Sequence, residues 1–226
     1  MTERSSSESC DGDTPAGLSE GCRLVAACFC QPDLAVFHEE RVYERLEAAL
    51  EARAPRAASS ARGLREAASS VSQADLLVEY ARLFVGPHAL VASPYGSVYL
   101  DEGGTVMGPS TMQVARTYRM AGVTPDPESG EPPDHISTEL EFLHYMASLE
   151  SQADALGDRD EFERLRMLRT KFLHESLNPW VGEFTRRIRE GTCEAYYQHL
   201  AACLDALVAC CNEGLHSALP DKEAAH

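Results

Sequence analysis

Aromatic residues and long apolar stretches are scarce in this sequence. Phe, Trp and Tyr together make up 7% of the 226 residues, with a single tryptophan, although 44% of the chain is hydrophobic. This composition predicts a core of aliphatic and alanine side chains and disfavours an all-β sandwich. The longest apolar run covers residues 24–30, far short of the roughly 20 residues that a membrane-spanning helix needs. We therefore expect no stable insertion into a membrane.

Basic residues are scarce as well. The chain has 20 Lys and Arg against 36 Asp and Glu, which gives a formal net charge of −16. A protein whose main partner is nucleic acid needs the opposite balance, because it must neutralise phosphates. We thus expect no nucleic-acid partner. Residues Met1 to Ser6 do not begin a secretory signal with an apolar segment, so we expect a cytoplasmic protein with reduced thiols.

Common enzyme motifs are missing. The sequence has no G-x-x-x-x-G-K-[ST], no G-x-S-x-G and no G-x-G-x-x-G after a predicted strand, so the usual nucleotide-binding and hydrolase signatures are excluded. Eight cysteines are present, but Cys28 with Cys30 and Cys210 with Cys211 lack the C-x-x-C spacing of zinc sites. We expect these cysteines to be small core residues, with no catalytic residue, bound metal or cofactor.

Hydrophobic residues recur at helical spacing through most of the chain. Cys22, Val25 and Phe29 give the first example, at i, i+3 and i+7. No Asn-Gly or Asp-Gly hairpin signal separates alternating apolar runs. We predict an all-α fold, a compact single-domain helical bundle of roughly eight to ten helices over residues 18–226. The Ser-rich, acidic residues 1–17 lack this periodicity and are expected to form a disordered tail.

Local signals mark where helices begin and where they are interrupted. Ser72 and Asp134 are residue types that cap helix N-termini, and each precedes an apolar periodic run. The Ala, Arg and Ser residues of 53–70 predict a mobile connection or a weak helix. Residues 92–104 predict a long irregular loop with aromatic side chains, and loops of that kind are usually functional. The proline-rich segment 123–134 predicts a stiff hinge between two helical halves.

Two Glu-x-x-His pairs allow an alternative function. Glu141-x-x-His144 and Glu213-x-x-His216 have the spacing with which facing helices build di-iron carboxylate sites. A helical-bundle metalloprotein or redox enzyme is therefore the second hypothesis. The simpler interpretation is that both pairs lie on the polar faces of amphipathic helices.

The sequence Glu-Pro-Pro-Asp-His-Ile at 131–136 is the most distinctive local feature. Its simplest interpretation is structural: two prolines lead to Asp134 as a helix N-cap. That interpretation leaves His135 unexplained, since a histidine in the first turn of a helix should lose basicity. A carboxylate and an imidazole beside the aromatic loop would form a recognition pocket. The residues alone leave capping and binding equally open.

Four segments together resemble a known family. They are Tyr-Ala-Arg-Leu-Phe-Val-Gly-Pro at 80–87, Ser-Pro-Tyr-Gly-Ser-Val-Tyr-Leu-Asp at 93–101, the Glu-Pro-Pro-Asp-His-Ile element, and His-Glu-Ser-Leu-Asn-Pro-Trp at 174–180. In this order and spacing they resemble the TorD/DmsD/NarJ family of redox-enzyme maturation chaperones, and the TorD/DmsD branch in particular. The resemblance covers most of residues 18–211, with segment 53–70 outside it.

This resemblance implies a cytoplasmic, all-helical chaperone that is not an enzyme. It would bind the twin-arginine signal peptide and the apoprotein of a DMSO-reductase-like, molybdopterin-containing enzyme, assist cofactor insertion and hold back export until maturation. A monomer or a dimer is expected. By motif position, the peptide-binding residues would be Leu83, Phe84, Pro94, Tyr95, Gly108, Glu131, Pro132, Asp134 and His135. The DmsD-like branch often has Trp at the position of Tyr95 and Gly at that of Ser137.

Acidic residues are concentrated after the hinge. Residues 131–161 contain nine acidic side chains against one arginine, a net charge of −8 and half of the chain's total of −16. A twin-arginine segment followed by an apolar stretch would be complemented by such an acidic rim beside an apolar groove. The alternative is an ordinary solvated helix face.

Overall fold

The chain folds into helices, as the periodicity predicts. The structure is a computed structural model and describes residues 16–86, 90–123 and 131–216. Its elements are α1 (Ala16–Cys28), α2 (Leu34–Glu39), α3 (Val42–Leu50), α4 (Pro55–Ala68), α5 (Gln73–Tyr80), the π-helical η1 (Ala81–Val85), α6 (Ser97–Leu100), α7 (Pro109–Met120), α8 (Ile136–Ala155), α9 (Arg159–Phe172), the π-helical η2 (Leu173–Leu177), α10 (Asn178–Gly191) and α11 (Ala195–His216).

The all-α prediction is confirmed. Because η1 continues α5 and η2 joins α9 to α10, the described residues form ten unbroken helical stretches. Over these residues the sole β-type pairing is an isolated antiparallel bridge between Tyr95 and His135. Since α1 begins at Ala16, the last two residues of the expected tail are helical; residues 1–15 and the hinge residues 124–130 lie outside the described part.

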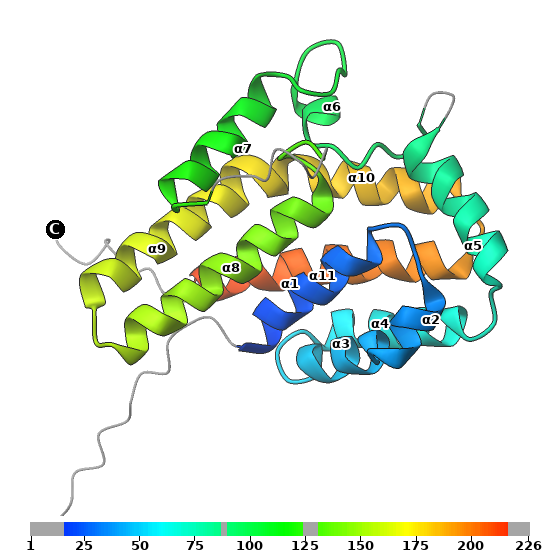
Figure 1. Ribbon diagram of the computed structural model, residues 1–226, viewed down its shortest axis with the longest axis horizontal. Coiled ribbons are helices and arrows are strands. Elements are labelled where there is room, and N and C mark those ends of the chain that lie inside the picture. The colour runs from blue at the N-terminus through cyan, green and yellow to red at the C-terminus, as the bar shows by residue number, and fades with distance from the viewer. Residues whose placement is uncertain (1–15, 87–89, 124–130, 217–226) are drawn as a thin grey trace, which may run out of the picture.

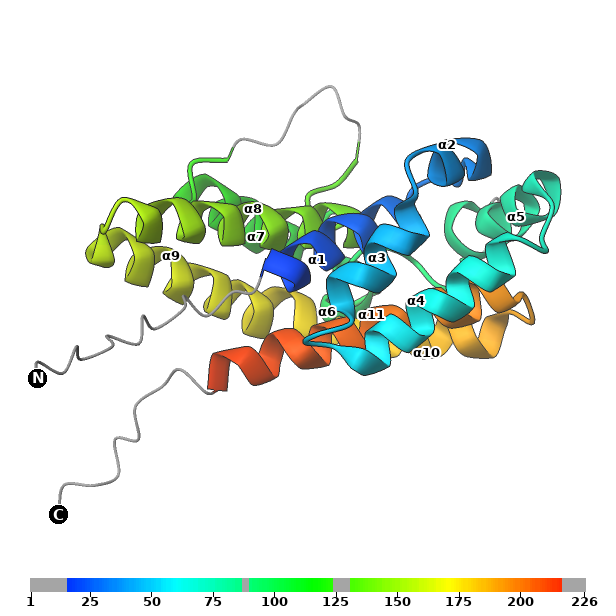
Figure 2. The ribbon, with the colours of Figure 1, turned by 90° about the horizontal axis from the view of Figure 1, so that it is seen from below.

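The helices pack around one apolar core. Helix α1 contacts α8, α3 and α11, while α11 also lies against α4 and α10. Both views place α2 and α5 at one end of the molecule and the turn between α8 and α9 at the other (Figure 1, Figure 2). Aromatic rings fill the centre, where Phe29, Phe84 and Phe184 contact one another at centroid distances of 5.5–6.2 Å. The core thus combines the expected aliphatic side chains with most of the chain's few aromatic rings.

Segment 53–70 is a well-packed helix, so the expectation of a mobile connection or weak helix is wrong. Helix α4 buries five alanines and Leu64 against α3 and α11. Alanine has the highest helix propensity, and its small side chain lets neighbouring helices approach closely. Gly63 shows how close this approach is, since a Cβ there would lie 2.4 Å from a ring atom of His199 on α11.

A buried ion pair joins α8 to α9. Arg169 donates two hydrogen bonds to the Glu150 carboxylate, at 2.6 and 3.1 Å, and the two side chains are 8% and 1% exposed. Such a two-point contact fixes the relative position of the two helices. Helix α8 begins at the Glu-Pro-Pro-Asp-His-Ile element, and Glu150 lies in its C-terminal half. The ion pair therefore holds that half of α8 against α9.

The remaining expectations concern membranes and thiols. Within the described ranges, no helix combines the length and the apolar character needed to span a bilayer. All described cysteines are free thiols.

Ser72 caps α5 as predicted, because its side chain accepts a hydrogen bond from the backbone N–H of Asp75.

Candidate functional site

Two segments far apart in the sequence meet in a short backbone pairing, which we call the junction; it consists of residues 94–97 and 131–136. The N–H of Ile136 donates to the carbonyl of Pro94 at 2.8 Å, and the N–H of Gly96 donates to the carbonyl of Asp134 at 2.9 Å. The Asp134 side chain adds a third contact by accepting from the N–H of Ser97 at 2.8 Å. The aromatic loop and the Glu-Pro-Pro-Asp-His-Ile element are therefore one structural unit.

Asp134 is not the N-cap of α8, contrary to the sequence prediction. The cap is His135, whose Nδ1 accepts from the N–H of Ser137 at 3.2 Å. The Asp134 carboxylate instead accepts from the first residue of α6, Ser97, so it holds the loop across the junction. Aspartate is a residue type that caps helices, but the backbone N–H that Asp134 accepts from belongs to Ser97, 37 positions away at the start of α6.

His135 is a buried, neutral imidazole. Only 5% of the residue is exposed. Burial lowers its pKa, and the nearby carboxylates of Glu131 and Asp134 oppose that shift only in part. The direction agrees with the sequence prediction, although burial is the cause and not the helix dipole. Since Nδ1 accepts the capping hydrogen bond, a neutral ring is also what the geometry requires.

Tyr80, Tyr95 and Glu131 lie together on the outer side of the junction, and we call them the outer face. The Tyr95 hydroxyl donates to the Glu131 carboxylate at 3.2 Å, and its ring meets His135 edge to face at 5.3 Å. Burial, followed by Glu131, raises the pKa of Tyr95 to about 12. The pKa of Tyr80 is also raised to about 12 by burial, with Cys30, Glu131 and Tyr95 as further causes. Glu131 thus contributes to the raised pKa of both tyrosines.

Six of the nine residues that the resemblance assigned to peptide binding are collected at the junction: Pro94, Tyr95, Glu131, Pro132, Asp134 and His135. Leu83 and Phe84 lie in the core instead, 0% and 4% exposed. The ring centroids of Phe84 and Tyr80 lie 5.4 Å apart, so Phe84 packs against a residue of the outer face from within the core. For Leu83 and Phe84 the structure supports packing, and a direct contact with a peptide remains a prediction.

Gly108, the ninth residue, lies away from the outer face, at the start of α7. The Asp101 carboxylate accepts from the backbone N–H and the hydroxyl of Ser110, at 3.2 and 2.8 Å. A Cβ on Gly108 would lie 2.1 Å from that carboxylate. Glycine is therefore required here by the close approach of Asp101, which stabilises the first turn of α7.

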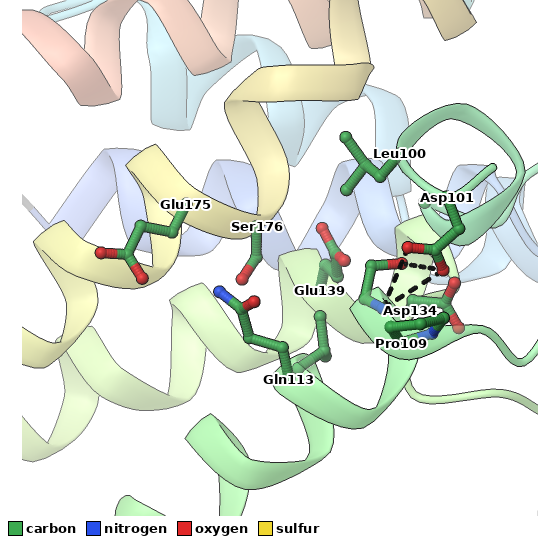
Figure 3. A pocket seen from close by; sticks show the side chains of 11 residues that line it. Leu100, Asp101, Pro109, Gln113, Asp134, Glu139, Glu175 and Ser176 are labelled. Atoms are coloured by element: carbon green, nitrogen blue, oxygen red, sulfur yellow. Dashed lines mark hydrogen bonds between the residues drawn. The ribbon is translucent and has the colours of Figure 1, made fainter.

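The inner side of the junction borders a polar pocket of about 280 Å³ (Figure 3). Its wall contains four acidic side chains together with small and apolar residues; the lining residues are Gly96, Leu100, Asp101, Pro109, Ser110, Gln113, Val114, Asp134, Glu139, Glu175 and Ser176. Of these, the sequence prediction included only Asp134. The sequence analysis treated Glu139 only as one member of the acidic run. Glu139 lies four residues after His135, and this spacing places both side chains on the same side of a helix, so it could have indicated that Glu139 belongs to the site.

Glu139 is a buried acid inside this wall. The residue is 1% exposed, and the indole N–H of Trp180 donates to its Oε2 at 3.3 Å. Burial, with a smaller contribution from Asp134, raises the pKa of Glu139 well above its usual value, while the Trp180 hydrogen bond opposes this shift. The carboxyl group therefore stays protonated to a higher pH than an exposed glutamate does.

Glu139→Gln is expected to change how stability depends on pH. Unfolded Glu139 ionises near pH 4.5, whereas the folded carboxyl has a raised pKa, so the wild type loses stability as the pH rises from that value through the folded pKa. Glutamine cannot ionise and avoids this loss. The variant should match the wild type in acid and exceed it increasingly toward neutrality, by at most ~1.4 kcal/mol per pH unit. Urea denaturation at several pH values measures the difference; a constant difference would show that Glu139 ionises normally.

A second, more apolar hollow of about 340 Å³ lies between the end of α7 and the first half of α8. Its lining residues are Tyr118, Gly122, Val123, Thr138, Glu141, Phe142 and Tyr145, so Glu141 is the sole charged side chain among the described ones. Partial burial, and then the carboxylates of Glu141 and Glu131, raise the pKa of the Cys30 thiol. Glu131 of the outer face and Glu141 of the hollow thus both contribute to the raised pKa of this thiol.

The metal hypothesis finds no cluster to support it in the part of the chain that is described. There, no group of three or more His, Cys, Asp or Glu residues is arranged to hold a metal ion. The Nδ1 atom of His144 lies 2.9 Å from the Ser19 hydroxyl on α1. The side chain of His216 lies outside the described part, so the second Glu-x-x-His pair stays untested.

Comparison with known proteins decides the family. Residues 49–186, well over half of the chain, match the model of the family described as nitrate reductase delta subunit. The chain belongs to that family. This is the TorD/DmsD/NarJ family that the four sequence segments indicated. The match includes segment 53–70, which was expected to lie outside the resemblance.

Curated members of the TorD/DmsD/NarJ family support the same assignment. The chain is 30% identical over 129 residues to the Tat proofreading chaperone DmsD of Salmonella paratyphi A, covering 57% of this chain and 56% of the relative. It is 26% identical over 126 residues to the chaperone protein TorD of Aliivibrio salmonicida, covering 56% and 57%. These alignments span little more than half the length of the relatives.

A solved structure shares the fold more completely. A protein from Archaeoglobus fulgidus, described as a redox enzyme maturation protein, superposes with a TM-score of 0.52 at 26% identity. The superposition covers 83% of this chain and 92% of the other. The helical architecture of the TorD/DmsD/NarJ family therefore extends beyond the aligned half of the sequence.

Proposed function

We propose that this protein is a cytoplasmic chaperone that binds the twin-arginine signal peptide and the apoprotein of a DMSO-reductase-like molybdoenzyme. It assists cofactor insertion and delays export until the client has matured. Its relatives are named as chaperones, and the proposed role is binding, with no catalysis by the chain itself.

The junction is the observation that carries this proposal. It gathers six residues that the resemblance assigned to peptide binding from two segments separated by more than 30 positions. An exposed carboxylate, Glu131, lies beside the partly exposed ring of Tyr95. Aromatic rings beside a charged group are typical of surfaces that anchor peptides.

The apolar hollow supplies a place for the rest of the leader. A twin-arginine motif is followed by an apolar stretch, and such a stretch would bury its side chains against Tyr118, Phe142 and Tyr145. Exposed Glu131 and the hollow's lining residue Glu141 would attract the arginines. The proposed peptide therefore runs from the outer face toward the hollow.

Co-purification from the source organism tests this function. The tagged full chain should retain the precursor of a molybdopterin-containing reductase with its leader still attached, as identified by mass spectrometry. A matched purification with the Tyr95→Ala variant should retain markedly less of it. Recovery of the mature, leaderless reductase, or of equal amounts with both proteins, would contradict the proposal.

A further inference from the structure

Two cysteines from the first and the last of the described helices have thiols in direct contact. Cys22 lies in α1 and Cys211 in α11, and the Cys22 thiol donates a hydrogen bond to the sulfur of Cys211. The two helices approach closely at this point, since a Cβ on Gly21 would lie 3.5 Å from the Leu207 side chain. Leu207 lies one helical turn before Cys211. The fold therefore brings together two free thiols that are far apart in the sequence.

Cys211 has the environment of a reactive thiol. It is half-buried, whereas Cys22 is 3% exposed. The hydrogen bond from Cys22 lowers the pKa of Cys211 and the Arg169 guanidinium lowers it further, although burial opposes both. The same hydrogen bond, together with burial, raises the pKa of Cys22 well above its usual value. Because the thiolate is the form that attacks an oxidant, Cys211 is suited to react first and Cys22 to react second.

Three other cysteines have the environments of unreactive thiols. Burial raises the pKa of Cys28 and of Cys203 to about 12. Burial also raises the pKa of Cys210, the neighbour of Cys211, and the Cys210 thiol donates to the carbonyl of Arg53 at 3.1 Å. Adjacent residues of a helix point about 100° apart, so Cys210 provides a matched control on the same helix.

We propose that Cys22 and Cys211 form a reversible intramolecular disulfide when the protein meets a peroxide. The Cys211 thiolate attacks one oxygen of hydrogen peroxide, the O–O bond breaks, and a sulfenic acid and a hydroxide ion result. The Cys22 sulfur then attacks the sulfur of the sulfenic acid, and its hydroxyl group leaves as water with the Cys22 proton. The two thiols together lose two electrons and two protons, and one peroxide molecule is reduced to two waters. A dithiol reductant reverses the reaction by thiol–disulfide exchange.

The disulfide would join α1 to α11 and close a loop that contains nearly all of the described chain. Closing a long loop lowers the conformational entropy of the unfolded state, so it favours the folded state. The oxidised protein should therefore melt about 5 °C or more above the reduced protein. Cys211→Ser should show no such difference. This inference stands apart from the proposed function, since neither cysteine belongs to the junction.

Counting free thiols before and after oxidation tests the proposal. The reduced full chain is treated with a slight excess of hydrogen peroxide, unfolded, labelled with a maleimide and weighed by mass spectrometry. The wild type should lose two of its eight labels, and dithiothreitol added before labelling should restore both. Cys210→Ser should also lose two labels, whereas Cys211→Ser should lose none. Cys22→Ser should lose one, because its Cys211 stops at the sulfenic acid, which dimedone traps.

The half-buried Cys211 makes Cys211→Ser the main comparison, and helical circular dichroism checks that this variant is folded. A wild type that keeps all its labels would overturn the proposal. So would a loss of two labels in Cys211→Ser, because the disulfide would then join other cysteines. An oxidised wild type that loses two labels but melts like the reduced protein would contradict a cross-link between α1 and α11.

Discussion

Glu150→Ala is expected to lower the free energy of unfolding by roughly 3–5 kcal/mol. The substitution removes the carboxylate that receives two hydrogen bonds from Arg169 and leaves a guanidinium charge in a region where that side chain is 8% exposed. Removing one partner of a buried ion pair costs far more than the pair itself contributes. Chemical denaturation followed by helical circular dichroism measures the effect.

Two further variants test this reason. Glu161→Ala removes an exposed carboxylate that receives two hydrogen bonds of 2.6 Å from Arg164, and it should cost little because solvent screens that pair. Replacing both Glu150 and Arg169 with Met should restore much of the stability, since both charges of this pair are then removed. If Glu150→Ala is as mild as Glu161→Ala, the buried pair does not fix α8 against α9.

Tyr95→Ala is expected to weaken binding of a twin-arginine leader about thirtyfold, the size of effect seen at central aromatic anchors. The ring packs against His135 and its hydroxyl meets Glu131, so its loss removes the main apolar surface of the outer face. Tyr95→Phe keeps the ring and should lose much less. Fluorescence anisotropy with a labelled leader compares the three proteins.

The matched control for Tyr95→Ala is Leu156→Ala, at the far end of helix α8. Leu156 is 84% exposed and follows the last residue of α8, whereas His135 precedes the first. A 20-residue helix separates them by about 30 Å. Leu156→Ala should therefore bind the leader like the wild type. A similar loss in both alanine variants would mean that the outer face is not the binding surface.

Local sequence signals predicted local structure well and tertiary partners poorly. The Ser72 cap was predicted correctly, because its hydrogen-bond donor, the N–H of Asp75, lies only three residues further along the chain. Asp134 was assigned to the nearest helix, but its carboxylate accepts from Ser97 in a distant segment. Capping propensity identifies a residue that can accept a hydrogen bond and carries no information about a donor that only the fold brings near.

Apolar composition could not separate core from surface. Leu83 and Phe84 suit a peptide groove and a core equally well by hydrophobicity, and the structure places them in the core. Segment 53–70 looked weak because alanine and serine give little amphipathic contrast, yet Gly63 and its neighbouring alanines let α4 pack closely on α11. Such close packing depends on the partner helix, which periodicity within the segment does not reveal.

The polar pocket could not be predicted for a similar reason. Asp101, Glu139 and Glu175 belong to three elements that are distant in the sequence, and only the fold brings them to one wall. Within the acidic run, the sequence does not distinguish the buried, paired Glu150 and the buried Glu139 with its raised pKa from solvated carboxylates. Their environments distinguish them, and those environments are set by Arg169 and Trp180.

Calorimetric titration of the full chain with two synthetic leaders is the most direct test of the central claim. One leader carries the twin arginines and the other has alanine in both positions. We predict that the arginine leader binds at least about tenfold more tightly, and that higher ionic strength weakens its binding without abolishing it, because exposed carboxylates such as Glu131 steer the arginines. Equal affinity for both leaders, or no binding of the arginine leader, would contradict the account.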